Sequence, residues 1–368
     1  MTLKQPQFIF TFTQKAKSFK ERSKNNIIMF VVEPTLVSNT TFEFETLEDA
    51  EKKQSTFAEN MQYIRDCFFF SVTPNLVTVY ALKEAPTDVS AFETLLDDVK
   101  KTREIAYVIY PKASTELQSE LVTWAKATES TNKTFKTIVS SATAPDSTVV
   151  VNLDPTQTVV YSDTTRTETD IKSYIPSLAS VLAGSGASRG VTYTKLTNLK
   201  RVTEPTDVDT SINAGHLVLI NDEADVRIAL GINSKTTLAD DEREDIKYLE
   251  VTETINLMKR DISNEFKNNY VGAGKKNNPD TQSLFLTDVN NYFIKLEEEN
   301  ILYVPFSNYA EIDTETQRQA WIDSGVPEAS TWDDTQVKNS PFRRDVFIKA
   351  QIKISNSVIN LKFNTTLN

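Results

Sequence analysis

Hydrophobic positions in the first half of the chain follow two patterns that alternate. Continuous apolar runs predict strands that are buried on both faces of a sheet. Residues 26–33 form such a run, and residues 76–82, 106–111, 136–141, 148–153 and 156–162 are further strand-like segments. Between these runs, apolar residues recur every three or four positions, which predicts amphipathic helices. These are residues 58–70, 88–103, 114–128 and 168–183. The alternation favours an α/β domain with a mostly parallel sheet.

The second half of the chain combines strand and helix patterns in another order. The run HLVLIND (216–222), a turn and VRIALGI (226–232) predict a β-hairpin, because apolar and polar residues alternate in the second strand. Residues 249–251 predict a short strand, and Thr254 is the expected N-cap of the helix that follows. A further helix is predicted over residues 284–296. This part of the chain is therefore expected to be α+β.

Both ends of the chain carry alternating strand patterns with no obvious partner. QFIFTFT (7–13) stands before a polar linker, and DVFIKAQIKIS (345–355) and VINLKF (358–363) close the sequence. An unpaired strand edge is costly when dry, so each strand folds back onto its own sheet or pairs with another subunit. The candidate inter-subunit residues are Phe8, Ile9, Phe10, Thr11, Phe12, Phe347, Ile348, Ala350, Ile352, Ile354, Ile359, Leu361 and Phe363.

These patterns divide the chain into four parts. Residues 1–24 are expected to form an N-terminal arm and linker, and residues 25–200 an α/β core domain. Residues 201–344 are expected to form a C-terminal α+β domain, followed by C-terminal strands over residues 345–368.

The charge balance argues against nucleic acid as a partner. The chain has 40 Lys and Arg against 51 Asp and Glu, a net charge of −11, and an acidic protein repels phosphates. No run of about 18 apolar residues exists, so we expect no membrane-spanning helix. The N-terminal apolar patch is short and lacks a small-residue cleavage site, so we expect no signal peptide.

Candidate catalytic chemistry is sparse. The chain has one cysteine, Cys67, and one histidine, His216, so zinc sites and Ser-His-Asp triads lack parts. We expect Cys67 to be a buried apolar side chain and His216 to be a strand-end residue. Asp240 and Asp241 lie in one charged run, whereas a hard cation needs oxygens from several segments. We predict no catalytic residue, metal ligand or cofactor, although carboxylates, Lys and Tyr alone can build an enzyme.

The glycine-rich segment AGSGASRG (183–190) invites comparison with a phosphate-binding loop. Such a loop follows a strand and opens a helix, but these glycines follow a predicted helix. Gly184 is therefore expected to end that helix.

A long series of elements resembles a known family. One element, VRIALGINSKTTL, contributes Arg227, Ile228, Ala229, Gly231, Asn233, Ser234, Thr236, Thr237 and Leu238. A helix end contributes Arg260, Asp261, Ile262, Asn269, Tyr270, Val271 and Gly272. On these residues the chain resembles the C-terminal half of contractile tail sheath proteins of Gram-positive myophages and R-type bacteriocins (tailocins), diffocin-like sheaths in particular. Two departures are Lys235, where the family often has Leu, and Ala273-Gly274, which lengthen a loop.

The resemblance implies a structural role without catalysis. The sheath would polymerise helically around a tail tube, as stacked rings that are hexameric in the family, and contract to drive the tube through the bacterial envelope. Implied partners are further copies of the chain, the tail tube protein, the baseplate and the tail terminator, with no direct nucleic-acid contact and no membrane insertion. The arms would join sheets in neighbouring subunits. The location would be a virion or tail-like particle assembled in the host bacterial cytoplasm.

Within this reading, Arg227, Gly231, Asn233, Ser234, Tyr270 and Gly272 are expected to be rigid scaffold residues. The acidic stretches 240–245 and 297–299 are either solvated or pair with basic residues of the N-terminal segment or with the tube. Those basic residues are Lys15, Lys17, Lys20 and Arg22. Two rival classes remain: another virion component, such as a tube or capsid protein, and a soluble α/β enzyme. The α/β alternation argues against a mostly-β tube protein.

Overall fold

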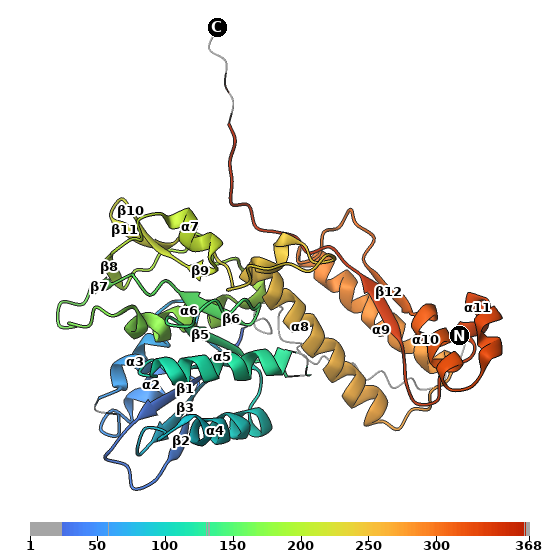
Figure 1. The fold of residues 1–368 in the computed structure, drawn as a ribbon, viewed down its shortest axis with the longest axis horizontal. Helices are drawn as coiled ribbons and strands as arrows, with labels where there is room; N and C mark the ends of the chain where they lie inside the picture. Colours follow the sequence, from blue (N-terminus) through green and yellow to red (C-terminus); the bar gives the residue numbers. More distant parts are fainter. Residues whose placement is uncertain (1–23, 58, 130, 132, 364, 366–368) are drawn as a thin grey trace, which may run out of the picture.

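The molecule has two lobes. The computed structural model describes residues 24–57, 59–129, 131, 133–363 and 365. One lobe is α/β, and the other is built around two long helices, as Figure 1 shows. The C-terminal segment leaves the molecule near the junction of the lobes as an extended chain (Figure 1). The predicted N-terminal strand, with Phe8, Ile9, Phe10, Thr11 and Phe12, lies outside the described residues.

The first lobe is organised around a seven-stranded sheet in the order β2-β3-β1-β4-β5-β6-β9. Its strands are β1 (Asn26–Val32), β2 (Thr40–Phe44), β3 (Val77–Leu82), β4 (Ala106–Ile109), β5 (Lys136–Val139), β6 (Val150–Leu153) and β9 (His216–Leu217). All neighbouring strands run parallel except β2 and β3. The predicted mostly parallel sheet is confirmed.

Helices cover both faces of this sheet. They are α2 (Leu47–Glu51), α3 (Met61–Asp66), α4 (Val89–Thr102), α5 (Thr115–Glu129) and α6 (Ile175–Ser185). The side chains of β1 alternate between two cores: Ile27 and Met29 join the one that contains α3 and α6. Ile28 and Phe30 join the other, with α4 and α5. This explains why the run is apolar throughout, since neither face of the strand meets water.

Two small antiparallel sheets extend the first lobe. They consist of β7 (Val159–Tyr161) with β8 (Leu199–Val202), and of β10 (Leu219–Asp222) with β11 (Asp225–Ile228); the helix α7 (Val208–Asn213) lies between them in sequence. The predicted hairpin is confirmed, but HLVLIND divides between β9 and β10. At the division, the side-chain amide of Gln157 pairs with the backbone of Leu219 in both directions, at 2.7 and 2.9 Å. A side chain thus takes the place of a neighbouring strand.

The predicted helix stop at Gly184 is wrong. Gly184 lies inside α6, which ends at Ser185 with Gly186 as its C-cap in the left-handed region, at φ +49°. A Cβ at Gly184 would lie 2.1 Å from the carbonyl oxygen of Val72. Glycine is therefore required there for close packing of the helix on a neighbouring loop, and the glycine that ends the helix stands two residues later.

The second lobe is mainly helical. It contains α8 (Leu249–Phe266), which continues as a π-helical turn (Lys267–Val271), α9 (Pro279–Glu298), β12 (Tyr309–Ile312), α10 (Thr314–Asp323), α11 (Asp334–Lys338) and β13 (Ile348–Gln351). Short 3₁₀ helices elsewhere are Ile171–Tyr174, Gly186–Ser188, Glu244–Lys247 and Pro327–Thr331. A third core, which includes Leu257, Phe285, Val289 and Phe293, joins α8 to α9.

The predicted strand over residues 249–251 and the predicted N-cap at Thr254 are both wrong. The helix α8 already begins at Leu249, and the hydroxyl of Thr254 donates to the carbonyl oxygen of Glu250 at 2.8 Å within it. Thr252, Glu253 and Thr254 are polar but buried. A helix is predicted from sequence by the spacing of its apolar residues. Because the buried residues in the first turns of α8 are polar, the sequence pattern did not predict that the helix begins at Leu249.

The strand predicted near the C-terminus has a partner within its own chain. β13 pairs antiparallel with β12, so that Ala350 lies opposite Ala310. Ile348, Ile352 and Ile354 pack against the core of the second lobe. Among the described residues, β12 is the only strand hydrogen-bonded to β13, and the other edge of β13 has no strand on it. Pairing across subunits through that edge stays a prediction.

Packing places the boundary between the lobes at the start of α8. Residues 201–248, assigned from sequence to the C-terminal domain, contribute Leu217, Leu219, Val226 and Ile228 to the core of the first lobe. A division at residue 200 would cut through that core and detach β9 from its sheet. The first lobe is therefore larger than the sequence suggested.

Candidate functional site

The scaffold residues that the resemblance singled out lie in two places. Arg227, Gly231, Asn233 and Ser234 lie on β11 and on the segment that leads from it toward α8, which is the junction of the lobes. Tyr270 and Gly272 lie at the far end of α8. Neither group contains a nucleophile next to a base, so we consider what each holds in place.

Arg227 fixes the hairpin to a neighbouring loop. Its Nε donates to Asp222 Oδ2 at 2.7 Å and its terminal nitrogen to Asp225 Oδ2 at 3.3 Å, which closes the hairpin turn. The guanidinium lies 5.0 Å from the ring centre of Tyr193 and donates to the carbonyl oxygen of that residue at 3.2 Å. A planar cation with several donors suits this combined pairing and stacking.

Gly231 and Asn233 tie the chain after the hairpin to its neighbours. The N–H of Gly231 donates to the hydroxyl of Thr192 at 3.0 Å, and a Cβ at Gly231 would lie 2.7 Å from Val191. Asn233 is buried, and its side-chain amide donates to the carbonyl oxygen of Ile246 at 2.8 Å. Glycine is needed for the close approach, and the amide supplies hydrogen bonds where strand pairing has stopped.

Ser234 and the two threonines after Lys235 attach the same segment to the main sheet. The N–H of Ser234 donates to the carbonyl oxygen of Val150 on β6 at 2.8 Å. The N–H groups of Thr236 and Thr237 both donate to Asp146 Oδ1, at 2.8 and 2.9 Å. The N–H groups of Thr237 and Thr236 hold the pKa of the Asp146 carboxyl well below its usual value of 3.8.

A buried ion pair attaches α8 to the sheet. Glu253 on α8 and Lys136 on β5 are almost completely buried and form a salt bridge. Glu253 also accepts from the hydroxyl of Tyr107 on β4 at 2.5 Å and from Nδ2 of Asn25 at 2.9 Å. Burial lowers the pKa of Lys136. Three donors from neighbouring positions of the sheet thus meet one carboxylate from the other lobe.

The sequence pattern did not identify this network, although it contains one signal for it. Lys136 opens the run KTIVSS, whose other members suit a buried strand, and Glu253 lies among β-branched residues in VTETI. A charged residue inside a run that is otherwise buried requires a partner of opposite charge. The sequence separation of 117 residues between the two kept the pair from being recognised.

Tyr270 packs the end of α8 against α9. Its ring centre lies 4.9 Å from that of Phe285, and its hydroxyl donates to Asp288 on α9. Nζ of Lys275, from the loop that follows, lies 4.1 Å from the centre of the Tyr270 ring. Gly272 ends the π-helical turn, and its N–H donates to the carbonyl oxygen of Lys267 at 2.7 Å. These residues close one end of the helix pair.

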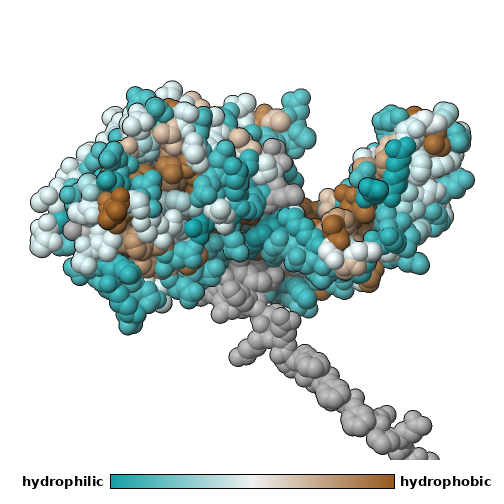
Figure 2. Space-filling model, turned by 90° about the horizontal axis from the view of Figure 1, so that it is seen from below, coloured by the Kyte–Doolittle hydropathy of each residue, from teal (hydrophilic) through white to brown (hydrophobic). Residues whose placement is uncertain are grey.

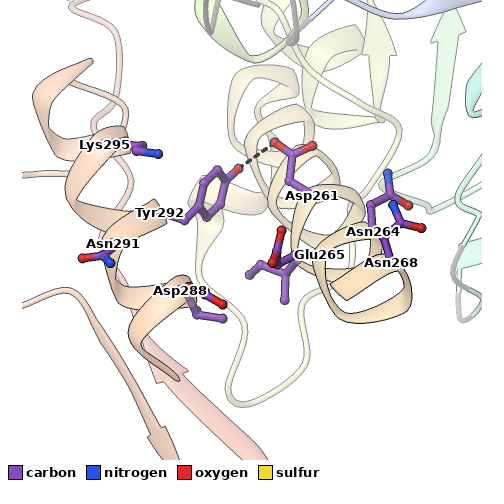
Figure 3. Close-up of a pocket in the computed structure, with 10 residues that line it drawn as sticks. Asp261, Asn264, Glu265, Asn268, Asp288, Asn291, Tyr292 and Lys295 are labelled. Atoms are coloured by element: carbon purple, nitrogen blue, oxygen red, sulfur yellow. Dashed lines mark hydrogen bonds between the residues drawn. The ribbon is translucent and has the colours of Figure 1, made fainter. Parts of the chain in front are cut away.

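A polar cleft of about 460 Å³ runs between α8 and α9, and Figure 3 shows its lining from both helices. Asp261 accepts from the hydroxyl of Tyr292 at 3.1 Å across the cleft, and Glu265 accepts from Asn269 at 2.8 Å. Asp288 accepts from Tyr270. The contacts of Asp261 and Asp288 join the two helices, whereas Glu265 contacts a residue of the continuation of its own helix.

The single histidine lies beside a serine and an aspartate, but in the wrong order for a catalytic triad. Ser211 Oγ donates to Asp154 Oδ2, and it lies 3.2 Å from Nδ1 of His216. In a triad the imidazole lies between the serine and the acid, where it takes the proton of the serine. Here the serine lies between the other two, so its hydroxyl is directed to the carboxylate.

The remaining candidate chemistry is similarly structural. Cys67 is buried in the core of the first lobe, as expected, and burial raises the pKa of its thiol. In the part of the chain that the structure describes, no three His, Cys, Asp or Glu side chains gather in a way that could hold a metal ion. Within that same part, no helix is both long and apolar enough to cross a membrane.

Comparison with known proteins supports one of the classes that remained. Residues 241–368 match the family model of the phage tail sheath C-terminal domain. A tail sheath protein of Clostridium phage phiCD119 is 24% identical over 361 residues, which cover 95% of this chain and 96% of that protein. Residues 241–368 thus belong to the phage tail sheath C-terminal domain, and nearly the whole chain is similar to a tail sheath protein. The resemblance stated from the sequence is confirmed.

Solved structures of sheath proteins share the fold. A sheath tail protein from Listeria innocua superposes with a TM-score of 0.68 at 12% identity, covering 91% of this chain and 98% of that one. The helical sheath of the anti-feeding prophage in its contracted state gives a TM-score of 0.67 at 13% identity, covering 99% and 100%. At these identities the likeness concerns the fold, and it confirms the predicted α/β class. The similarity to tail sheath proteins is consistent with a structural role.

Proposed function

We propose that this sheath protein is the subunit of a contractile tail, which polymerises helically around a tail tube and contracts to drive the tube through a bacterial envelope. The similarity to tail sheath proteins supports the structural role. The arrangement supports it as well, because the scaffold residues hold loops, hairpin and helices together instead of surrounding a reaction centre.

The observation that carries the proposal is the C-terminal segment after β13. Val358, Leu361 and Phe363 are 94, 87 and 80% exposed. No strand partner for residues 356–363 exists among the described residues. Large apolar side chains on an extended, unpaired backbone are typical of a strand that is completed by another chain. We propose that this segment, with Ile359, Leu361 and Phe363, is an arm that joins a neighbouring subunit.

The open edge of β13 is a suitable acceptor for such an arm. The two-stranded sheet β12–β13 belongs to the second lobe, and an arm strand from a neighbour would extend it. We propose the same for the predicted strand over residues 7–13. An arm on one surface and an acceptor edge on another form a heterologous contact, which generates open helical assemblies.

Contraction would rearrange whole subunits. The two lobes are joined through the buried Glu253–Lys136 pair, which favours motion as one body with bending in the arms. The anti-feeding prophage sheath was solved in a contracted helical state, which supports such an end state for this protein. The surface shown in Figure 2 gathers apolar side chains on the second lobe where it faces the hollow between the lobes, a face available for contacts within the assembly.

The finer assignments follow the family. We propose stacked hexameric rings as the form of assembly, and the tail tube protein, baseplate and tail terminator as partners. Assembly would take place in the cytoplasm of a bacterial host, and the product would be a virion or a tailocin particle. The net charge of −11 favours protein partners over direct contact with nucleic acid.

Negative-stain electron microscopy of the purified chain tests the proposal. We expect hollow, striated tubes or stacked rings from the full chain. Deletion of residues 1–20 should leave a folded protein, by circular dichroism, that no longer forms tubes. Tubes that are unchanged by the deletion would refute the role of the N-terminal arm. A full chain that stays a uniform small particle, even with purified baseplate added as a nucleus, would refute the sheath function.

A further inference from the structure

The C-terminal segment leaves the molecule beside the first turn of α8. The N–H of Ser355 donates to the carbonyl oxygen of Ile301 at 2.8 Å, which keeps this residue in the second lobe. Two residues later, the N–H of Ser357 donates to Oε1 of Glu250 at 3.0 Å, and the Ser357 hydroxyl donates to Oε2 of the same carboxylate. Glu250 therefore holds the chain by two hydrogen bonds at the point where the exposed segment begins.

Gly190 leaves the space that the contact between Glu250 and Ser357 requires. A Cβ on Gly190 would lie 2.5 Å from Oε2 of Glu250 and 2.7 Å from Oγ of Ser357. Any side chain there would displace the carboxylate, the hydroxyl or both. The side chain of Asn356 adds a longer contact of 3.4 Å to Asp245. The last glycine of AGSGASRG is thus explained by the passage of the C-terminal segment over it.

The same helical turn is anchored to the sheet. Glu253 lies three residues after Glu250 and makes the buried contacts to Lys136 and Tyr107 described above. The start of α8 therefore holds the C-terminal segment through one carboxylate and the main sheet through another. No segment between them can move independently, because they belong to a single turn of helix.

We propose that Glu250, with Ser357 and Gly190, is a clamp that passes tension on the C-terminal arm directly to the start of α8 and through Glu253 to the main sheet. The inference rests on the proposed function, since only an arm held by a neighbouring subunit comes under tension. Its residues are positioning residues for the arm.

The position of the clamp explains why it is needed. Counted back from the exposed segment, the chain first pairs with residues 301–303 through the backbone of Ser355 and Lys353. It then enters β13, which holds β12 through four residue pairs at the edge of a small sheet. Tension that reached β13 would separate these pairs one after another from the end. With Ser357 fixed to Glu250, the tension enters a helix of 18 residues that is anchored in a buried core.

Hydrogen exchange on the isolated protein tests whether the clamp exists. In Glu250→Gln, exchange across Asn356, Ser357 and β13 should become faster, by about tenfold at the Ser357 amide, because its acceptor loses the negative charge. Ser357→Ala removes only the hydroxyl contact to Glu250 and keeps the amide contact, so it should make the same exchange faster to a smaller extent. Ser355→Ala is the matched control, because the hydrogen bond described for Ser355 is made by its backbone, and it should exchange as the wild type does. Equal protection in all four proteins would overturn the clamp.

Assembled tubes test the mechanical role. Tubes of Glu250→Gln and of the control are triggered to contract or are sheared, and their lengths are measured by electron microscopy. We expect variant tubes to form and then to break into pieces several-fold shorter than those of the control. Tubes of equal length would overturn the transfer of tension. If the wild type forms no tubes, the proposed function is refuted, and the transfer of tension is refuted with it. Faster hydrogen exchange in the variants would still show that the contacts between Glu250 and Ser357 exist, so the two failures can be distinguished.

Discussion

Glu253 shows how a single polar residue can join two parts of a molecule. Its carboxylate accepts from Lys136, Tyr107 and Asn25, so that burial of the charge is compensated by an ion pair and two further hydrogen bonds. A buried pair of this kind adds little to stability when compared with an apolar pair, but it is costly to break from one side. It selects one position of α8 on the sheet, since a shifted helix would leave both charges without partners.

Replacement of Glu253 by Gln should therefore be strongly destabilising. The change leaves the Lys136 ammonium buried without its counter-charge, and we expect the free energy of unfolding to fall by about 3–5 kcal/mol. Urea denaturation followed by circular dichroism measures this loss. Glu48→Gln is the control: its side chain is 86% exposed in an ion pair with Lys52, and it should change stability by less than about 1 kcal/mol. A loss equal to that of the control would contradict the proposed importance of the pair.

Asp146 links stability to pH. The N–H groups of Thr237 and Thr236 hold its pKa below the usual 3.8, so the folded state prefers the carboxylate. The stabilisation is present above about pH 4, and it is lost as the pH falls through the lowered pKa. Asp146→Asn should be less stable than the wild type at pH 7, and the difference should narrow below pH 4. Denaturant titrations at pH 7, 4 and 2.5 measure it.

Asparagine is the informative replacement because Asp146 has a φ of +46°. Asn adopts this left-handed conformation about as readily as Asp, so the substitution removes the charge without adding backbone strain. A difference between the two proteins that stays constant from pH 7 to 2.5 would mean that the charge of Asp146 does not stabilise the fold.

At the scale of elements, the sequence predicts the helices and strands whose own hydrophobic pattern indicates which residues are buried. The runs that became β1, β3 and β4 are apolar except for Asn26 and Thr78, because helices cover both faces of their sheet. The start of α8 was not predictable in this way, since Glu253 is buried by partners that lie far away in sequence. The alternation over residues 347–354 gave a strand but no partner, because a pleated pattern identifies a buried face and not the strand beside it.

The scaffold site was predictable only through the family resemblance. No physical pattern singled out Asn233 or Ser234, which are polar residues in a turn-like segment. Their function depends on the carbonyl oxygens of Ile246 and Val150, which the fold brings near them. Gly231 is different, because a glycine between two strand-like segments already indicates a close approach of backbones.

The division of the C-terminal region between β13 and the arm leads to a test by truncation. A chain that ends at residue 355 keeps β13 and its pairing with β12, so it should unfold at the same temperature as the full chain, within about 2–4 °C. A chain that ends at residue 346 also loses Ile348, Ile352 and Ile354 from the core of the second lobe. Its second lobe should be unstable, which limited proteolysis and thermal unfolding would reveal.

Tube formation gives a second test of the chain that ends at residue 355. The chain that ends at residue 355 should be folded but unable to form tubes, because the exposed segment is missing. Normal tubes from this protein would mean that residues 356–368 are not an arm, whereas a large loss of thermal stability would mean that they belong to the fold of their own subunit.

At the scale of the whole molecule, charge sets the conditions for polymerisation. Each subunit has a net charge of −11, so identical subunits repel one another at long range. Added salt screens this repulsion, since the Debye length falls from about 30 Å at 0.01 M to about 10 Å at 0.1 M ionic strength. The contacts that we propose, strand pairing and burial of the apolar arm, depend little on salt. Tube formation by the full chain should therefore increase between 10 and 200 mM salt, in about the range where the Debye length changes.

Light scattering and sedimentation of assembled protein across this salt range measure the effect, with the chain that ends at residue 355 as a control that does not assemble. The opposite trend has a definite meaning. If assembly decreases as salt is added, attraction between unlike charges outweighs the net repulsion. The basic residues Lys15, Lys17, Lys20 and Arg22 would then pair with acidic stretches of a neighbour, such as residues 240–245. Charge reversal at Asp240 and Asp241 would decide between the two. It reduces the net negative charge, so it should strengthen assembly at low salt when repulsion dominates and weaken assembly when such pairs form.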